Sequence, residues 1–220
     1  MKITDNVYIV PEVRANAYLL VDSDGITLID AGLPGNQKRI LGYVAAIGKS
    51  PSDLKRIILT HGDLDHVGSL HPLHTATRAR TYASQIEAQA MASGKPSRVI
   101  NVRMPLIRRL VRLLMKQKPF QVDEILTDGQ VLPILGGLLV VDTAGHTPGH
   151  ISLFAPAASI LFCGDSMVTD DNGIHGSRPA LTWDQTKAAE AVRRQAALGA
   201  RILCSGHGPV VMDAAGRYPI

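Results

Sequence analysis

The chain has 220 residues, 45% of them hydrophobic, with 23 Lys and Arg against 19 Asp and Glu. This composition excludes an intrinsically disordered chain, and a count of two cysteines excludes a disulfide-stapled scaffold. Eight of the Lys and Arg residues, and no Asp or Glu, fall within residues 94–118, so the rest of the chain is net acidic. A basic excess confined to one segment does not predict a nucleic-acid-binding protein.

The hydrophobic pattern predicts an α/β chain in which strands and helices alternate. The predicted strands are residues 7–10, 17–21, 26–30, 55–60, 79–83, 150–156, 158–165 and 200–208, with a Gly-Gly hairpin within 134–146. The predicted helices are residues 36–48, 84–93, 104–117 and 183–198, and residues 166–182 are predicted to form a long loop. We expect one domain over 1–220, with a basic amphipathic helical insertion at about 94–118.

No window reaches 18 consecutive apolar residues, and the polar N-terminus lacks the apolar stretch of a signal peptide. Together with the low cysteine count, this favours a cytoplasmic protein with no stable membrane insertion.

A histidine or an aspartate stands at the C-terminal end of four predicted apolar strands, at His61, His146, Asp165 and His207. Strand ends in sheet-rich α/β proteins face a shared crevice, so these side chains could converge there. The segment HGDLDH adds Asp63, Asp65 and His66 to His61. Imidazole nitrogens and carboxylate oxygens are ligands for divalent metals such as zinc, and a two-metal hydrolytic site needs roughly this many.

These residues resemble the ligand series of the metallo-β-lactamase-fold hydrolases: His61-x-Asp63-x-Asp65-His66, then His146 in HTPGH, Asp165 in CGD and His207 in SGHG. The segment NAYLLVDSDGITLIDAGLPG resembles the opening strands and turn of that superfamily. The resemblance implies a four-layer αβ/βα sandwich with two mixed sheets flanked by helices, and the metals at one edge.

The resemblance also implies roles for these residues. His61, Asp63 and His146 would hold a first divalent ion, and Asp65, His66 and His207 a second, with Asp165 as the bridge. The ions are expected to be zinc, with manganese or iron as alternatives. A hydroxide between the metals would attack the ester, lactone or thioester carbonyl of a small-molecule substrate, and Asp65 would orient that water.

Asp63 departs from the family pattern, HxHxDH, which has histidine at this position. It could bind the metal through its carboxylate, or it could be too short and leave the first site weak. An added carboxylate makes the centre less positive, which predicts an alkaline activity optimum. In a third reading, His61, His146 and Asp165 hold a single iron, as in the family's persulfide dioxygenases. A non-catalytic binding or regulatory protein that kept the fold is a further alternative.

Other residues carry weaker signals. His175 and Arg178, in the predicted loop, could contact a substrate or could lie on a solvated surface. His150 is expected to be structural, and Cys163 and Cys204 to be small buried residues. The amphipathic helix at 103–118 could be a lid, a homodimer contact or an ordinary core-packed helix.

Overall fold

The computed structural model describes residues 1–98 and 118–220. The predicted basic helix, and most of the insertion expected at about 94–118, lie outside the described residues. No helix in the described ranges is long and apolar enough to cross a membrane.

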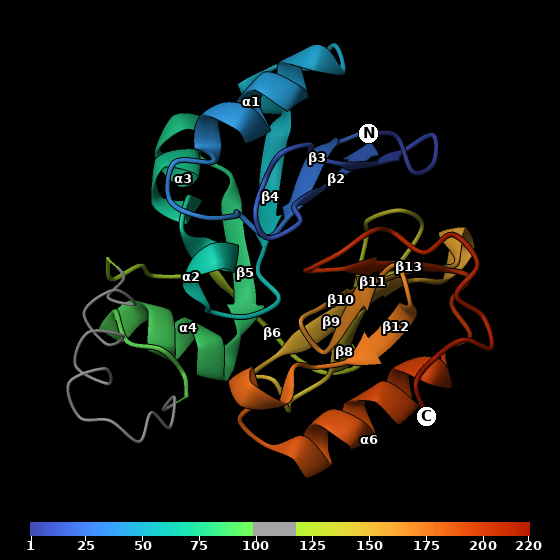
Figure 1. The fold of residues 1–220 in the computed structure, drawn as a ribbon. Coiled ribbons are helices and arrows are strands. Elements are labelled where there is room, and N and C mark those ends of the chain that lie inside the picture. Colours follow the sequence, from blue (N-terminus) through green and yellow to red (C-terminus); the bar gives the residue numbers. More distant parts are fainter. Residues whose placement is uncertain (99–117) are drawn as a thin grey trace.

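Two β-sheets lie face to face in the centre of the molecule (Figure 1). The first has the order β1 (Val7–Ile9), β2 (Tyr18–Asp22), β3 (Gly25–Ile29), β4 (Leu54–Ile58), β5 (Arg80–Ser84) and β6 (Glu124–Leu126). The second has the order β13 (Ile202–Ser205), β10 (Ile160–Gly164), β9 (Ile151–Ala155), β8 (Leu138–Asp142) and β7 (Val131–Leu132). Both sheets combine parallel and antiparallel pairs.

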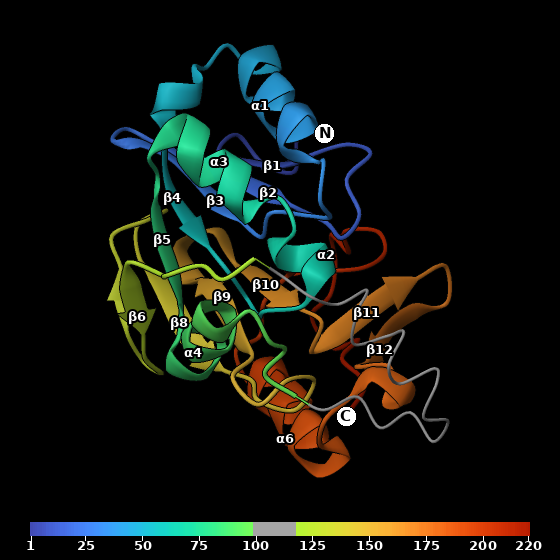
Figure 2. The ribbon, with the colours of Figure 1, turned by 90° about the vertical axis from the view of Figure 1, so that its left-hand side faces the viewer.

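Helices cover the outer faces of both sheets (Figure 2). The described helices are α1 (Gln37–Ala46), α2 (Leu64–Val67), α3 (Leu70–Thr77), α4 (Gln85–Ser93) and α6 (Gln185–Ala196). Helices α1, α3 and α4 lie on the side of the first sheet, and α6 packs on the second. Short 3₁₀ turns occur at Pro51–Asp53, Pro156–Ala158 and Pro179–Leu181.

The alternation of side chains along each strand explains the layers. Leu19 of β2 points into the core beneath the helices of the first sheet, whereas its neighbours Tyr18 and Leu20 pack between the two sheets. A third core joins the outer face of the second sheet to α6, for example through Leu161 and Val192. Three cores between four layers confirm the predicted αβ/βα sandwich.

The long loop predicted at 166–182 is wrong in its first half. Residues Met167–Asp170 (β11) pair antiparallel with Gly173–Gly176 (β12) as a separate hairpin. The turn falls at Asp171-Asn172, followed by Gly173 at a φ of +128°, a backbone conformation that glycine adopts without strain. Asp, Asn and Gly are turn-forming residues, and reading the whole stretch as a loop overlooked the strands on either side of them.

Candidate metal centre

The loops that follow four strands bring all seven predicted ligands to one edge of the sandwich. His61 follows β4 and Asp63 is the residue before α2, which carries Asp65 and His66. The loops after β8, β10 and β13 carry the others, which are His146, Asp165 and His207. The strand-end pattern therefore predicted where these residues meet.

The seven side chains supply three groups of closely spaced donor atoms: two lie on either side of Asp165, and the third combines Asp165 with His61 and His66. In the first, Oδ2 of Asp63 lies 3.6 Å from Nε2 of His61 and 3.3 Å from Nε2 of His146. In the second, Oδ2 of Asp65 lies 3.3 Å from Nε2 of His207 and 4.0 Å from Nε2 of His66.

Asp165 lies between the two groups. Its Oδ1 is 3.3 Å from Nε2 of His66, and its Oδ2 is 3.7 Å from Nε2 of His146 and 3.3 Å from Nε2 of His207. With zinc–ligand bonds of about 2.0–2.1 Å, tetrahedral ligand atoms are about 3.3–3.4 Å apart. The spacing of the donor atoms is therefore close to that around divalent ions.

Three donor atoms are buried without a hydrogen-bond partner in the described residues: Nε2 of His61, Nε2 of His66 and Oδ1 of Asp165. A buried polar atom without a partner destabilises the fold by roughly 1–3 kcal/mol. Cations bound between these side chains would satisfy the three atoms, so the residues fit divalent metal binding.

The far side of three imidazole rings is anchored. Nδ1 of His66 lies 2.8 Å from Oδ2 of Asp30, Nδ1 of His61 is 3.0 Å from the Thr60 hydroxyl, and Nδ1 of His146 is 2.9 Å from the Ser177 hydroxyl. Such contacts at Nδ1 fix the ring orientation and direct Nε2 toward a metal.

The carboxylates of the centre stay ionised. Burial raises the pKa of Asp63, but the nearby imidazoles of His146 and His61 and the charge of Arg98 outweigh it, so the pKa lies well below its usual value. The pKa of Asp165 behaves in the same way, because the charge of His66 and the nearby imidazole of His207 overcome burial.

The imidazoles divide into two classes. Hydrogen bonds to Asp165 and Asp65 raise the pKa of His207 to about 9. Burial lowers the pKa of His66, but the nearby charges of Asp165 and Asp30 have the larger effect, so its pKa lies well above the ordinary 6.5. Burial lowers the pKa of His146. Without metal, His66 and His207 are therefore protonated, and their protons balance part of the negative charge that metal cations would balance.

His150 is a buried structural residue, as predicted. Its buried ring lies 2.8 Å from the Thr143 hydroxyl through Nδ1, and its Nε2 accepts a hydrogen bond from the backbone N–H of Asp165. Burial and the neighbouring His61 and His146 lower the pKa of His150 well below 6.5, so the ring is a neutral acceptor. It holds the backbone of Asp165 and is in none of the donor groups. Both cysteines are buried, as expected.

The two predicted substrate contacts differ in position. His175 lies on β12, and the described contact of its Nε2 is with Oδ1 of Asp170, 2.8 Å away on the same hairpin. Arg178 is exposed and directly follows Ser177, the residue that anchors His146.

Sequence reasoning missed three residues around the centre. Asp30 anchors His66, and it ends a strand, so the strand-end pattern could have found it. Glu87 is fully buried, and Arg98 is 5% exposed with its guanidinium against Asp63. No local pattern distinguishes Glu87 from a solvated helix residue, or Arg98 from the other basic residues of its segment.

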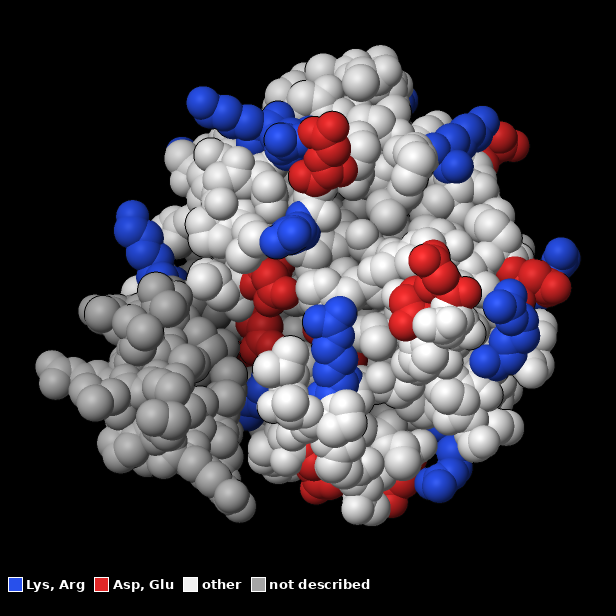
Figure 3. All heavy atoms as spheres, viewed as in Figure 1, with Lys and Arg blue, Asp and Glu red and all other residues white. Residues whose placement is uncertain are grey.

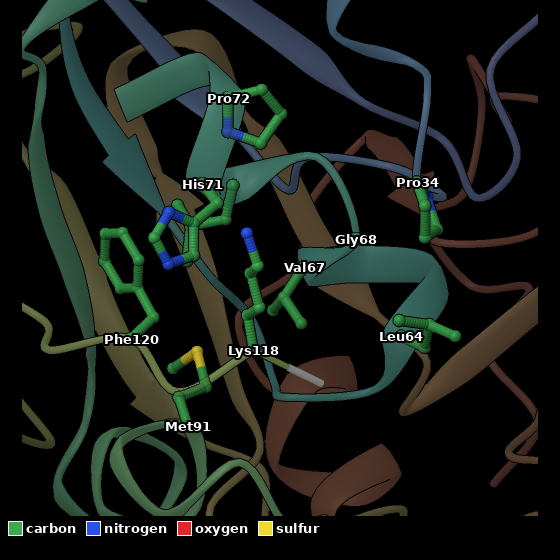
Figure 4. Close-up of a pocket in the computed structure, with 10 residues that line it drawn as sticks. Pro34, Leu64, Val67, Gly68, His71, Pro72, Met91, Lys118 and Phe120 are labelled. Atoms are coloured by element: carbon green, nitrogen blue, oxygen red, sulfur yellow. The ribbon is translucent and has the colours of Figure 1, made fainter. Parts of the chain in front are cut away.

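An apolar pocket of about 240 Å³ lies beside α2 (Figure 4). Leu64, between the two aspartates of the motif, and Val67 line it together with Met91 and Phe120, and Lys118 extends along its side. On the face shown in Figure 3, acidic atoms lie in a hollow near the middle, with basic side chains beside them. The pocket therefore shares helix α2 with two of the predicted ligands, Asp65 and His66.

Comparisons with known proteins agree with this geometry. The family model of the metallo-beta-lactamase superfamily matches residues 10–207. The probable metallo-hydrolase YflN of Bacillus subtilis is 29% identical, over 88% of this chain and 80% of that protein. A hydroxyacylglutathione hydrolase of Fuscovulum blasticum is 28% identical, over 92% of this chain and 66% of that protein.

Among solved structures, a metallo-beta-lactamase of Cronobacter sakazakii with a HARLDQ motif superposes with a TM-score of 0.73. It is 24% identical and covers 94% of this chain and 76% of that chain, which establishes a common fold. The family match over residues 10–207, the sandwich and the His/Asp centre lead to one conclusion: the chain belongs to the metallo-β-lactamase superfamily.

Proposed function

We propose that the protein is a dinuclear metal-dependent hydrolase that cleaves the ester, lactone or thioester carbonyl of a small molecule. The observation that carries the proposal is the pair of donor groups on either side of Asp165, each with its donor atoms within 4.8 Å of one another. His61, Asp63 and His146 would hold one ion, and Asp65, His66 and His207 the other. Two divalent ions supply a nucleophilic water at neutral pH and polarise the carbonyl.

Asp65 is the carboxylate we assign to handling protons. Its side chain is 36% exposed, against 13% for Asp63 and 10% for Asp165, so it is the one that a substrate and its leaving group can reach. Burial raises the pKa of Asp65, but the hydrogen bond from His207 and the charge of His66 lower it below its ordinary value. An ionised, accessible carboxylate can orient a water molecule and carry a proton to the leaving group.

The pocket beside α2 supports an acyl substrate. Its lining is largely apolar and includes Leu64 and Val67 of α2, the helix that carries Asp65 and His66. An acyl chain seated there would lie against this helix, with the Lys118 side chain at hand for an anionic group. The names of the related proteins, a probable metallo-hydrolase and a hydroxyacylglutathione hydrolase, favour the same reaction class.

The test is turnover by metal-free protein reconstituted with zinc or manganese. A panel of aryl esters, acyl lactones and acyl thioesters would be assayed beside Asp65→Asn, which keeps the size of the side chain. We expect metal-dependent hydrolysis of at least one class, with kcat reduced by about 10²–10⁴-fold in the variant. Oxygen consumption with persulfide substrates by an iron-loaded protein would instead establish the dioxygenase. The absence of turnover on the panel and of oxygen consumption would favour a non-catalytic protein.

A further inference from the structure

We propose that Asp63 and Arg98 act as one unit, a buried ion pair whose zero net charge takes the place of the neutral imidazole expected at position 63. The inference rests on the first metal group of the proposed function, although it concerns metal binding and not the reaction. Arg98 is a positioning residue in this account, because it acts on the metal through Asp63.

The guanidinium of Arg98 contacts two members of the first metal group. Its Nη2 donates a hydrogen bond of 2.6 Å to Oδ2 of Asp63, and its Nη1 donates one of 3.1 Å to the carbonyl oxygen of His146. The same Oδ2 atom faces Nε2 of His61 and of His146. Arg98 therefore fixes the oxygen that would bind the first ion, and the backbone of a second ligand.

Burial makes this pair different from a surface salt bridge. The side chain of Arg98 is 3% exposed and that of Asp63 is 13% exposed. Removing one partner of a buried pair leaves an uncompensated charge, whereas surface pairs have little effect. The preceding residue, Ser97, donates a hydrogen bond to Glu87, which holds this part of the chain against the centre.

The charge at the first group follows from the two side chains together. Aspartate in place of neutral histidine adds one negative charge, and a guanidinium keeps its positive charge in proteins. The sum for positions 63 and 98 is zero, as for a lone neutral histidine at 63. The alkaline activity optimum expected from the sequence assumed that nothing balances the charge of the Asp63 carboxylate. Because Arg98 balances it, that expectation no longer follows.

A matched set of variants separates charge from space. Asp63→His alone leaves the Arg98 cation beside a divalent ion without a balancing carboxylate. Adding Arg98→Met removes that charge and keeps a side chain of similar length, whereas adding Arg98→Lys keeps the charge. If the pair is a unit, tight metal binding by Asp63→His requires that the charge at position 98 is removed. A slimmer side chain that keeps the charge, as in Arg98→Lys, should not restore binding.

The experiment is zinc titration of metal-free protein against a chromophoric competing chelator. We expect two tight sites in the wild type and in Asp63→His/Arg98→Met. We expect one tight site in Asp63→His and in Asp63→His/Arg98→Lys, with the other site weakened at least about tenfold by the uncompensated cation. Two equally tight sites in Asp63→His, or no recovery on adding Arg98→Met, would overturn the proposal.

Two further measurements keep the outcome clear. Arg98→Met alone should retain both zinc sites. Loss of the first zinc site in this variant would mean that Arg98 acts only by orienting Asp63, which would contradict a role in charge balance. If Asp63→His does not fold, as judged by circular dichroism, Asp63→Asn replaces it, and its weakened first site should recover with Arg98→Met. A protein that follows this pattern but hydrolyses no substrate would refute the proposed function and leave the pair established.

Discussion

Replacement of Glu87 by glutamine should lower the free energy of unfolding by about 2 kcal/mol. Glu87 is fully buried on α4 and accepts four hydrogen bonds from three other segments. Its Oε1 accepts from the hydroxyls of Ser97 and Thr147, at 2.9 and 2.7 Å, and from the backbone N–H of Gly149 at 3.1 Å. Its Oε2 accepts from the backbone N–H of Gly62 at 2.9 Å.

The expected loss of stability follows from the hydrogen bonds that glutamine can still accept at position 87. Its carbonyl oxygen can stay at the Oε1 position with three donors, and its NH₂ group then meets the N–H of Gly62 as a second donor. One hydrogen bond to a charged acceptor is lost, which is worth about 1.5–3 kcal/mol. For a chain of this size, 2 kcal/mol corresponds to a fall in Tm of about 4–8 °C.

The assay is urea unfolding followed by circular dichroism, with Glu190→Gln as the control. Glu190 is exposed on α6, so its replacement should change stability by no more than about 0.5 kcal/mol. Because Gly62 lies between His61 and Asp63, we also expect weaker zinc binding in Glu87→Gln. If Glu87→Gln were as stable as Glu190→Gln, the hydrogen bonds of Glu87 would not stabilise the packing of these segments in the way that we infer.

Three other predictions concern the centre and its surroundings. Zinc binding at pH 7.5 should release about two protons per chain, because the raised pKa values of His66 and His207 keep both protonated without metal; calorimetry in buffers of different ionisation enthalpy would measure this, and a buffer-independent enthalpy would contradict it. The Tm of metal-free protein should fall as pH rises from about 6.5 through 9, because the pKa of His207 is higher in the folded than in the unfolded protein. Its protonation stabilises the folded state fully at pH values below the unfolded-state pKa, and this stabilisation is lost as the pH rises past the folded-state pKa. Gly206→Ala should weaken zinc binding, because the added Cβ would lie 2.2 Å from Oδ1 of Asp165, whereas Gly42→Ala, in an exposed helical position with open space, should stabilise the protein by about 0.5–1 kcal/mol and leave zinc binding unchanged.

Local sequence patterns were sufficient to place most of the strands and helices, whereas the four-layer arrangement was expected from the family resemblance. Strands such as β3 and β10 are short apolar runs followed by polar residues, which is the pattern of strands buried on both faces. β6 was not predicted, because it is only three residues long and includes Glu124. The hairpin of β11 and β12 was missed because its strands, MVTD and GIHG, contain few apolar residues and therefore lack the apolar run of the predicted strands.

The ligands were predictable because each one ends a strand or belongs to a single compact motif. The residues that support them were not, since their roles depend on contacts between distant segments. Arg98 meets Asp63 across 35 positions, and Glu87 meets Gly149 across 62. Charge balance at the centre therefore required the structure, because the sequence does not show which basic residue faces which carboxylate.

The most direct test of the dinuclear centre is the zinc content of purified protein, measured by elemental mass spectrometry after dialysis, for the wild type and for Asp63→Ala. The account predicts about two zinc ions per chain in the wild type and about one in the variant, because Asp63 belongs to one donor group only. A single ion per chain, unchanged by the loss of Asp63, would contradict it.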